Sequence, residues 1–270
     1  MKKNRKIIPA ILLIATTAFA SFACKNKADT KTKPVDNETA FAVCNTAFQG
    51  TKNAEKFTKT EQISYKNELE DAFSYAVDST TFDVEKGIFA SIQSENGDYT
   101  FLKCAEKAGD TYNVVRANRP DSNREWSVTT NSWTDYDMKD EIMYDSFVVS
   151  ETWLKTSLTA FDFTDELSEA DVDFECSATV SGSGVYVIYG KCVVNEDGLI
   201  SLGNEQEKFE VTSYVLEMKL TFNKSCWLGL WVKAELKSKS DGKSKAMIYE
   251  IDSKQSNSYD KSIYDSVKRE

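Results

Sequence analysis

The sequence contains no histidine among its 270 residues. Histidine is the usual general base of serine and cysteine hydrolases, a common zinc ligand, and the side chain that titrates near neutral pH. Its absence excludes Ser-His-Asp and Cys-His catalysis, histidine-ligated zinc and histidine-based pH switching. Chemistry based on paired carboxylates, lysine-assisted nucleophiles or an oxygen-only Ca²⁺ site remains compatible with the composition.

Long hydrophobic runs are also missing, because nothing after residue 24 approaches the roughly 18 apolar residues of a transmembrane helix. The one apolar run, residues 7–20, is too short to span a bilayer as a mature helix. It follows the cations Lys2, Lys3, Arg5 and Lys6 and ends at Ser21-Phe22-Ala23-Cys24, after which the composition turns polar at once. This order is typical of a secretory export signal.

These 24 residues resemble the signal of bacterial lipoproteins, in the looser form seen in spirochaete-like bacteria. Ala23 and Cys24 match the two most demanding positions of the cleavage motif. Ser21 stands where leucine is usual, and Phe22 is bulkier than usual. The resemblance implies that residues 1–23 are removed as a signal peptide and that Cys24 is lipidated, with acyl chains such as palmitate. The alternative is an ordinary secretory signal, because Ala18-Phe19-Ala20 and Ser21-Phe22-Ala23 both offer a small-x-small cleavage site.

The resemblance also implies a location in the cell envelope, bound to the lipid bilayer through the N-terminal acyl chains. Two or three acyl chains hold a protein stably at a membrane, whereas one chain holds it marginally. In some bacteria an aspartate directly after the lipidated cysteine is a signal for retention in the inner membrane. Lys25 occupies that position here, and the missing aspartate favours the outer membrane. Residues 24–40 are polar, with no apolar residue larger than Val35, so we expect a flexible tether before a folded part at residues 41–270.

Cysteine is sparse and its spacing shows neither a CxxC pair nor a zinc pattern. If Cys24 carries lipid, five cysteines remain, and an odd number cannot all pair internally. If Cys24 stays a free thiol, six cysteines allow three disulfides. We favour lipidation, because the other five lie in strand-like runs where a small buried thiol is common. They are Cys44, Cys104, Cys176, Cys192 and Cys226.

The charge is strongly unbalanced, with 43 acidic residues against 33 basic ones. The first 40 residues have more basic than acidic side chains, so the folded part is more acidic than the net charge of −10 suggests. A surface of this sign disfavours nucleic acid and direct adsorption on anionic lipid. It suits a solvated protein outside the cytoplasm.

Alternation of apolar and polar residues predicts antiparallel strands in the C-terminal half. Residues 170–181 carry six apolar side chains at even positions and six polar ones at odd positions, the pattern of a strand with one buried face. The further strands are expected at 185–194, 214–222, 226–236 and 246–251. Turns are expected at Ser181–Gly184, Asn195–Gly198 and Asp241-Gly242. Consecutive strands joined by short turns make a meander.

The N-terminal half is less regular. Asn96-Gly97 predicts a hairpin between strands at 88–94 and 98–105, and residues 41–48 and 112–117 are predicted as strands. Residues 60–77 fit both a helical face and strand alternation, and we interpret them as a helix. The polar stretch 118–125 predicts a loop and a sub-boundary, and Tyr259, Ile263 and Val267 predict a short C-terminal helix. The sequence thus predicts a mainly β fold, an antiparallel meander forming a sandwich or an open or closed barrel, with one or two short helices.

The sharpest candidate for a ligand site is the strand that begins near Cys226. Its even positions are apolar, so Trp227, Gly229 and Trp231 are expected on the opposite face. The two indoles would then lie roughly 13 Å apart, with only a glycine between them, as a stacking platform for sugar rings. The alternative is that a helix covers this face and both tryptophans belong to the core.

A second candidate is the acidic stretch that follows Trp133. Asp135 and Asp137 are alternating carboxylates suited to Ca²⁺. The stretch is not an EF-hand, because positions six and twelve counted from Asp135 are Asp140 and Ser146 rather than glycine and glutamate. A solvated acidic loop is the alternative interpretation.

The leading hypothesis is a membrane-anchored lipoprotein of the bacterial envelope with a non-enzymatic binding or structural ectodomain. One alternative is an envelope enzyme that acts on polysaccharide through carboxylates, although histidine, a nucleophile motif and a Gly-rich phosphate loop are all missing. The other is a barrel that carries an apolar ligand. We expect no cofactor, and as partners the lipid bilayer and a glycan or protein ligand.

Overall fold

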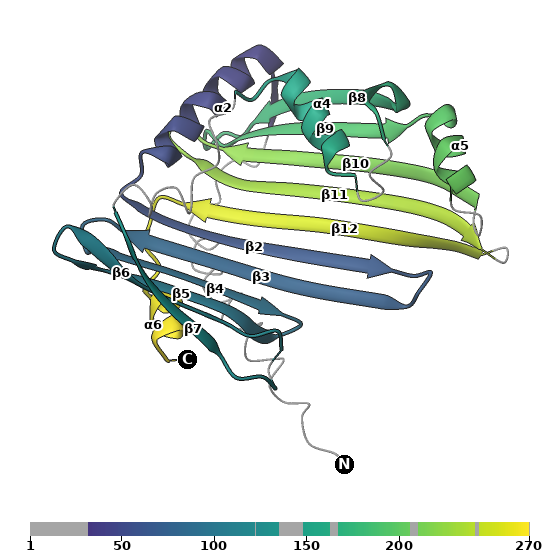
Figure 1. Cartoon of the computed structure of the whole chain (residues 1–270). Helices are drawn as coiled ribbons and strands as arrows, with labels where there is room; N and C mark the ends of the chain where they lie inside the picture. The colour runs from purple at the N-terminus through teal and green to yellow at the C-terminus, as the bar shows by residue number, and fades with distance from the viewer. Residues whose placement is uncertain are drawn as a thin grey trace.

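The computed structural model describes residues 32–121, 123–134, 148–162, 167–205, 210–240 and 243–269. Their strands form one twelve-stranded sheet in the order β1-β8-β9-β10-β11-β12-β2-β3-β4-β5-β6-β7, and every neighbouring pair is antiparallel (Figure 1). The strands are β1 Lys33–Val35, β2 Lys56–Asn67, β3 Ala72–Asp83, β4 Ile88–Glu95, β5 Asp98–Ala108, β6 Thr111–Asn118, β7 Ser127–Trp133, β8 Val172–Val180, β9 Tyr186–Val194, β10 Glu210–Phe222, β11 Trp227–Ser240 and β12 Lys243–Ser256.

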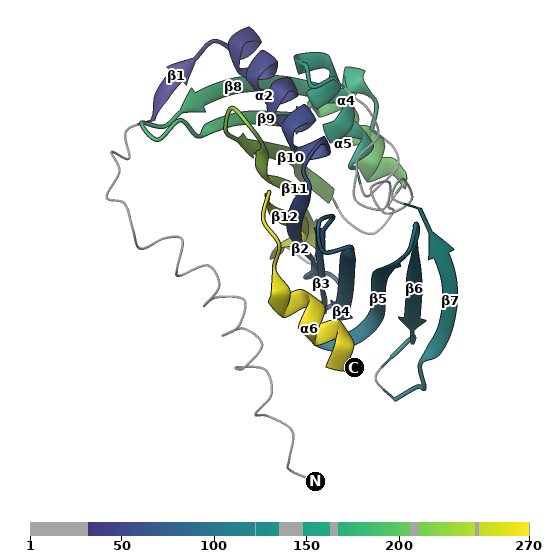
Figure 2. The ribbon, with the colours of Figure 1, turned by 90° about the vertical axis from the view of Figure 1, so that its left-hand side faces the viewer.

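The sheet is curved, and helices cover parts of both its faces (Figure 2). Three of them, α2, α4 and α5, lie on the concave face against β8–β11, and α6 lies on the convex face against β3–β5. A short 3-10 turn, η1, precedes β8. The bounds are α2 Asn37–Lys52, α4 Glu151–Ala160, η1 Glu169–Asp171, α5 Glu196–Glu205 and α6 Lys261–Arg269.

Two meanders make up the sheet, and the pairing of β12 with β2 joins them. The mainly β meander predicted from the sequence is therefore confirmed. Among the described strands the sheet has two open edges, β1 and β7. A closed barrel does not fit this arrangement, whereas an open barrel or a sandwich does.

Most of the predicted strands are present where the alternation indicates them. The hairpin at Asn96-Gly97 is confirmed, since both residues have positive φ values, 50° and 90°, as a two-residue type I′ turn requires. The C-terminal helix predicted from Ile263 and Val267 is confirmed as α6. The turn at Asp241-Gly242 lies outside the described residues, but Ser240 pairs with Lys243 across it.

The predicted strand at 41–48 is wrong, because these residues lie inside α2. Asp36 caps the helix by accepting a hydrogen bond from the Thr39 amide at 2.8 Å. The buried residues of α2 recur at helical spacing along one face. They are Ala40, Cys44, Ala47, Phe48 and Thr51.

The helix interpretation of residues 60–77 is also wrong, because they form β2 and β3. Ile63 and Tyr65 of β2 pair with Ile251 and Tyr249 of β12. The apolar residues of this segment fit both helical spacing and strand alternation. The segment forms strands because β12, which lies far along the chain, pairs with β2. Tertiary pairing overrides local preference in such a case.

Two boundaries and the number of helices also differ from expectation. Lys33–Val35 pairs with β8 and α2 begins at Asn37, so the second half of the expected tether, 24–40, belongs to the fold. The loop after Asn118 joins β6 to β7, which pair with each other, so no boundary divides the sheet there. The described residues form four helices rather than one or two, and Asn195–Gly198, expected as a turn, leads into α5.

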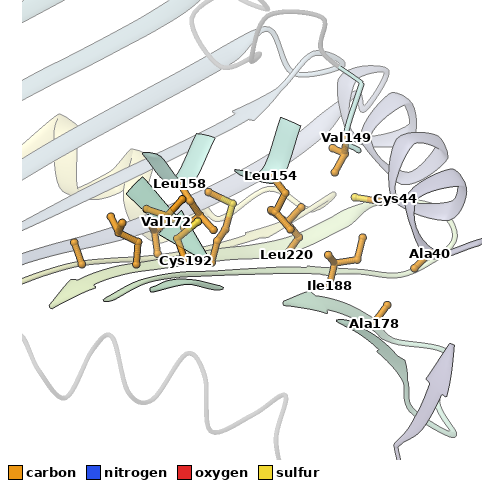
Figure 3. Close-up of a cluster of buried hydrophobic side chains, with 14 of the residues drawn as sticks. Ala40, Cys44, Val149, Leu154, Leu158, Val172, Ala178, Ile188, Cys192 and Leu220 are labelled. Atoms are coloured by element: carbon orange, nitrogen blue, oxygen red, sulfur yellow. The ribbon is translucent and has the colours of Figure 1, made fainter. Parts of the chain in front are cut away.

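The largest hydrophobic core lies between the concave face of β8–β12 and the three helices that cover it. Leu154 and Leu158 of α4 and Cys44 of α2 point toward strand residues that include Ile188 (Figure 3). A second cluster on the same face, around Phe57, Phe82 and Tyr112, lies at one end of β2–β7. A third joins α6 to the convex face of β4 and β5.

Candidate functional site

Trp227 and Trp231 lie on opposite faces of the sheet, so the expected two-indole platform is not formed. Thr221 of β10 pairs with Gly229, and the next pair is Phe222 with Trp227. Leu228 is therefore an extra residue, a β-bulge that reverses the side to which Trp227 points. The strict alternation assumed from the sequence fails at this residue.

Trp227 is a core residue beneath α2. Its side chain is 3% exposed, its indole Nε1 donates to the Cys44 carbonyl at 3.2 Å, and its ring lies 5.3 Å from that of Phe48. The backbone amide of Trp227 also donates to Thr51 Oγ1 at 2.9 Å. These contacts fix the end of β11 to α2 and leave no surface of this indole for a ligand.

Trp231 stays on the convex face, half-buried, with partners on both neighbouring strands. Its Nε1 donates to Glu250 of β12, and Lys219 of β10 lies 4.3 Å from its ring centroid. Next to it, the Tyr189 hydroxyl donates to Glu217. The ring is held in a cation–π and hydrogen-bond network of the protein itself.

The other predicted site residues, Cys24, Asp135 and Asp137, lie outside the described residues. Within the described ranges, no group of three cysteine or acidic side chains is placed to hold a metal ion. Asp162, which lies just after α4, is buried and accepts hydrogen bonds from the Tyr214 hydroxyl and the Leu167 amide. It fastens the end of α4 to β10.

The five described cysteines are all free thiols. Four of them are buried, as expected of small thiols in a core. Burial raises the pKa of Cys44 to about 12 and the pKa values of Cys176 and Cys192 to about 11. Thiols in this state are poor nucleophiles, and their burial suits them to packing rather than to reaction.

A set of polar residues on the concave face was not recognised in the sequence, and we call it the polar belt. It runs across five neighbouring strand pairs from β12 to β6, because residues that pair directly share a face. It consists of Ser253 and Gln255 on β12, Lys59 and Glu61 on β2, Asp78 and Thr80 on β3, Ser91 and Gln93 on β4, Lys103 on β5 and Arg116 on β6.

Several members of the polar belt are removed from solvent. Lys103 is 5% exposed, and its ammonium lies 5.1 Å from the ring centroid of Trp133 and 5.5 Å from that of Phe101. Gln255 is 8% exposed, and its Oε1 atom has no hydrogen-bond partner among the described residues. At β6 the belt opens to solvent, because Arg116 is exposed.

Acidic groups of the belt lie next to one another. Glu61 and Asp78 pair across β2 and β3, and the Lys59 ammonium lies 3.0 Å from Glu61. The Thr80 hydroxyl lies 3.3 Å from Asp78 Oδ1 and 3.0 Å from Ser91 Oγ. Burial raises the pKa of Asp78, and the nearby Glu61 adds to this against the attraction of Lys59 and Lys103.

The belt contrasts with the part of the same face that lies on β10 and β11. On β10 and β11 the same face carries Leu216, Met218, Val232 and Ala234, which are buried in the largest core. Buried charges and unpartnered amides destabilise a fold relative to apolar side chains of similar size. The belt places hydrogen-bond donors, acceptors and the rings of Phe101 and Trp133 on one face of the sheet.

None of the helices within the described ranges is both long and apolar enough to cross a bilayer. No protein-family model matches the sequence, and no curated protein matches it.

Proposed function

We propose that this protein is a membrane-anchored lipoprotein of the bacterial cell envelope whose ectodomain binds a polar ligand, such as a glycan, without transforming it. The anchoring part of the proposal is supported by the signal that ends at Cys24. An outer-membrane location is favoured by Lys25 after that cysteine.

The observation that carries the binding proposal is the polar belt. Its charged and amide side chains occupy positions where the same face of β10 and β11 is apolar. A fold selected for stability alone would bury hydrophobic side chains there. Groups that reduce stability are retained where they serve function. Carboxyl groups with a shifted pKa, such as that of Asp78, are concentrated at functional sites.

A second candidate function is a polysaccharide-acting enzyme of the envelope. It is favoured by the pairing of Glu61 with Asp78, since two carboxyl groups lie side by side there and burial raises the pKa of Asp78. Binding remains the leading proposal, because both carboxyls already have partners within the belt. The apolar-carrier alternative is not favoured, as α2, α4 and α5 fill the apolar part of the concave face.

Gln255→Leu tests the binding proposal by removing an amide whose Oε1 atom has no partner among the described residues. We expect the free energy of unfolding to be unchanged or about 1 kcal/mol higher, because an unsatisfied polar atom is removed. We expect glycan affinity to fall about tenfold, which corresponds to about 1.4 kcal/mol. Isothermal titration calorimetry with a panel of N-acetylglucosamine oligomers, neutral hexoses and uronic acids measures the affinity.

Gln62→Leu is the matched control, since Gln62 lies on β2 but pairs with Asp252 on the convex face. Its affinity should equal that of the unmodified protein. Equal affinities of all three proteins, or no binding of any glycan in the panel, would contradict the binding proposal. Hydrolysis of a glycan that Asp78→Asn abolishes while binding persists would favour the enzyme instead.

A further inference from the structure

The two edges of the sheet differ in how they are protected against pairing with another chain. β1 has three residues, and Lys33 and Pro34 are two of them. A charged residue and a proline are the usual devices that keep an edge strand from adding a further strand. β7, at the opposite edge, has seven residues, SVTTNSW, without a charge, a proline or a glycine.

Within the described ranges, the outer edge of β7 faces solvent. Its inner edge is fully used, because all seven residues from Ser127 to Trp133 pair with β6. Among the described residues no strand pairs with its outer edge. The first six residues of β7 are exposed, and only Trp133 is buried. β7 therefore presents a row of backbone donors and acceptors to water, as an uncovered edge strand does.

An apolar groove runs beside this edge on the convex face, where β5, β6 and β7 meet α6. Its volume is about 320 Å³. Val128 of β7 and Val115 of β6 line it and are 59% and 45% exposed, an unusual exposure for two apolar side chains that are neighbours on one face. The remaining lining residues are Leu102, Cys104, Glu106, Asn113, Ala117, Trp126, Val267 and Lys268.

The walls of the groove are fixed by contacts within the protein. Arg119 lies 4.3 Å from the ring centroid of Trp126 and donates to the Tyr99 carbonyl at 2.7 Å. On the α6 side, Lys268 and Glu106 form an ion pair at 2.6 Å. The groove is therefore pre-formed, which lowers the entropy lost when a partner binds.

We infer that β7 is a docking edge for an extended segment of another protein. The segment adds to the sheet antiparallel to β7, and its apolar side chains on the convex side enter the groove beside Val128. Only an extended backbone matches the row of donors and acceptors on β7, and alternate side chains of such a segment fall on one face. This surface is separate from the polar belt, which occupies the concave face.

The size of the surface argues against a second copy of this chain as the partner. A stable protein–protein interface uses about 20–30 residues a side, whereas β7 offers seven residues and the groove a few more. Pairing of two β7 strands about Thr130 would place Ser132 of one copy beside Val128 of the other. A hydroxymethyl group would then face the groove, and its apolar lining would stay unfilled.

The test uses the folded protein and a fluorescent peptide of seven alternating valines and threonines flanked by lysines. Fluorescence anisotropy measures its affinity, and amide hydrogen exchange measures protection of β7. We expect saturable binding together with slower exchange of the β7 amides. A peptide of the same side chains with N-methylated backbone amides on its pairing edge should bind at least tenfold more weakly.

Val128→Lys should weaken binding at least tenfold, because it places a charge at the mouth of the groove. Val148→Lys is the matched control, since Val148 is 72% exposed and lies outside the groove lining. Its affinity should be unchanged. The inference is overturned if the peptide does not bind, if binding leaves β7 exchange unaltered, or if the protein alone dimerises in a way that Val128→Lys abolishes.

Discussion

Trp227→Ala is expected to lower the free energy of unfolding by about 3–5 kcal/mol, the usual loss for a large buried aromatic side chain. The indole is 3% exposed and contacts Phe48 and the Cys44 carbonyl of α2. Truncation leaves a cavity between β11 and α2 and removes the hydrogen bond from the indole to the Cys44 carbonyl. Urea denaturation followed by circular dichroism measures the loss.

Trp231→Ala is the matched control, because it makes the same substitution four residues along the same strand. This indole is half-buried, and its partners Lys219 and Glu250 keep contact with solvent. We expect a loss of about 1 kcal/mol, in the range of an exposed cation–π contact and partial burial. Equal losses at the two positions would contradict the placement of the two tryptophans on opposite faces.

The contact between α4 and β9 gives the second large expected effect. A Cβ atom added at Gly190 would lie 2.6 Å from Leu154 Cδ2 and 2.8 Å from Leu154 Cγ. Leu154 is completely buried, so it has little room to move. We expect Gly190→Ala to lower the free energy of unfolding by about 1–3 kcal/mol, as overpacking does. Leu154→Ala should lower it by about 2–5 kcal/mol, as a cavity does.

The double variant of Gly190→Ala and Leu154→Ala separates this explanation from a general weakness of the region. Truncation of Leu154 makes room for the added methyl group, so the combined loss should be smaller than the sum of the single losses by about 1 kcal/mol or more. The same urea titrations measure all three variants. Strictly additive losses would show that the two residues do not touch.

Much of the strand pattern could be predicted from the sequence, because alternation reports directly on a half-buried strand. Residues 170–181 and the Asn96-Gly97 turn are the clearest cases. The segment at 41–48 was misassigned because its apolar residues are too many and too closely spaced to select one period. Its helical face becomes evident only when the Asp36 cap and the burial of Ala40 and Cys44 are seen together.

The candidate site was much less accessible to sequence reasoning. Alternation shows which residues of a strand share a face, but not which face the fold encloses. Only the pairing of β12 with β2, which places both meanders in one curved sheet, shows that Lys103 and Asp78 lie on the same face as the largest core. The single extra residue at Leu228 likewise has no signal in the sequence, although it decides where Trp227 points.

The most direct test of the central claim, a lipid-anchored envelope protein, is the intact mass of the native protein extracted with detergent, before and after thiol alkylation under non-reducing, denaturing conditions. We predict a chain of residues 24–270 that carries two or three acyl chains on Cys24 and alkylates at the five cysteines that are free in the structure. Cys24→Ser should abolish the acyl mass, whereas Cys226→Ser should keep it. A lipid-free chain that begins at Ser21 or Cys24 and contains three disulfides would contradict the account.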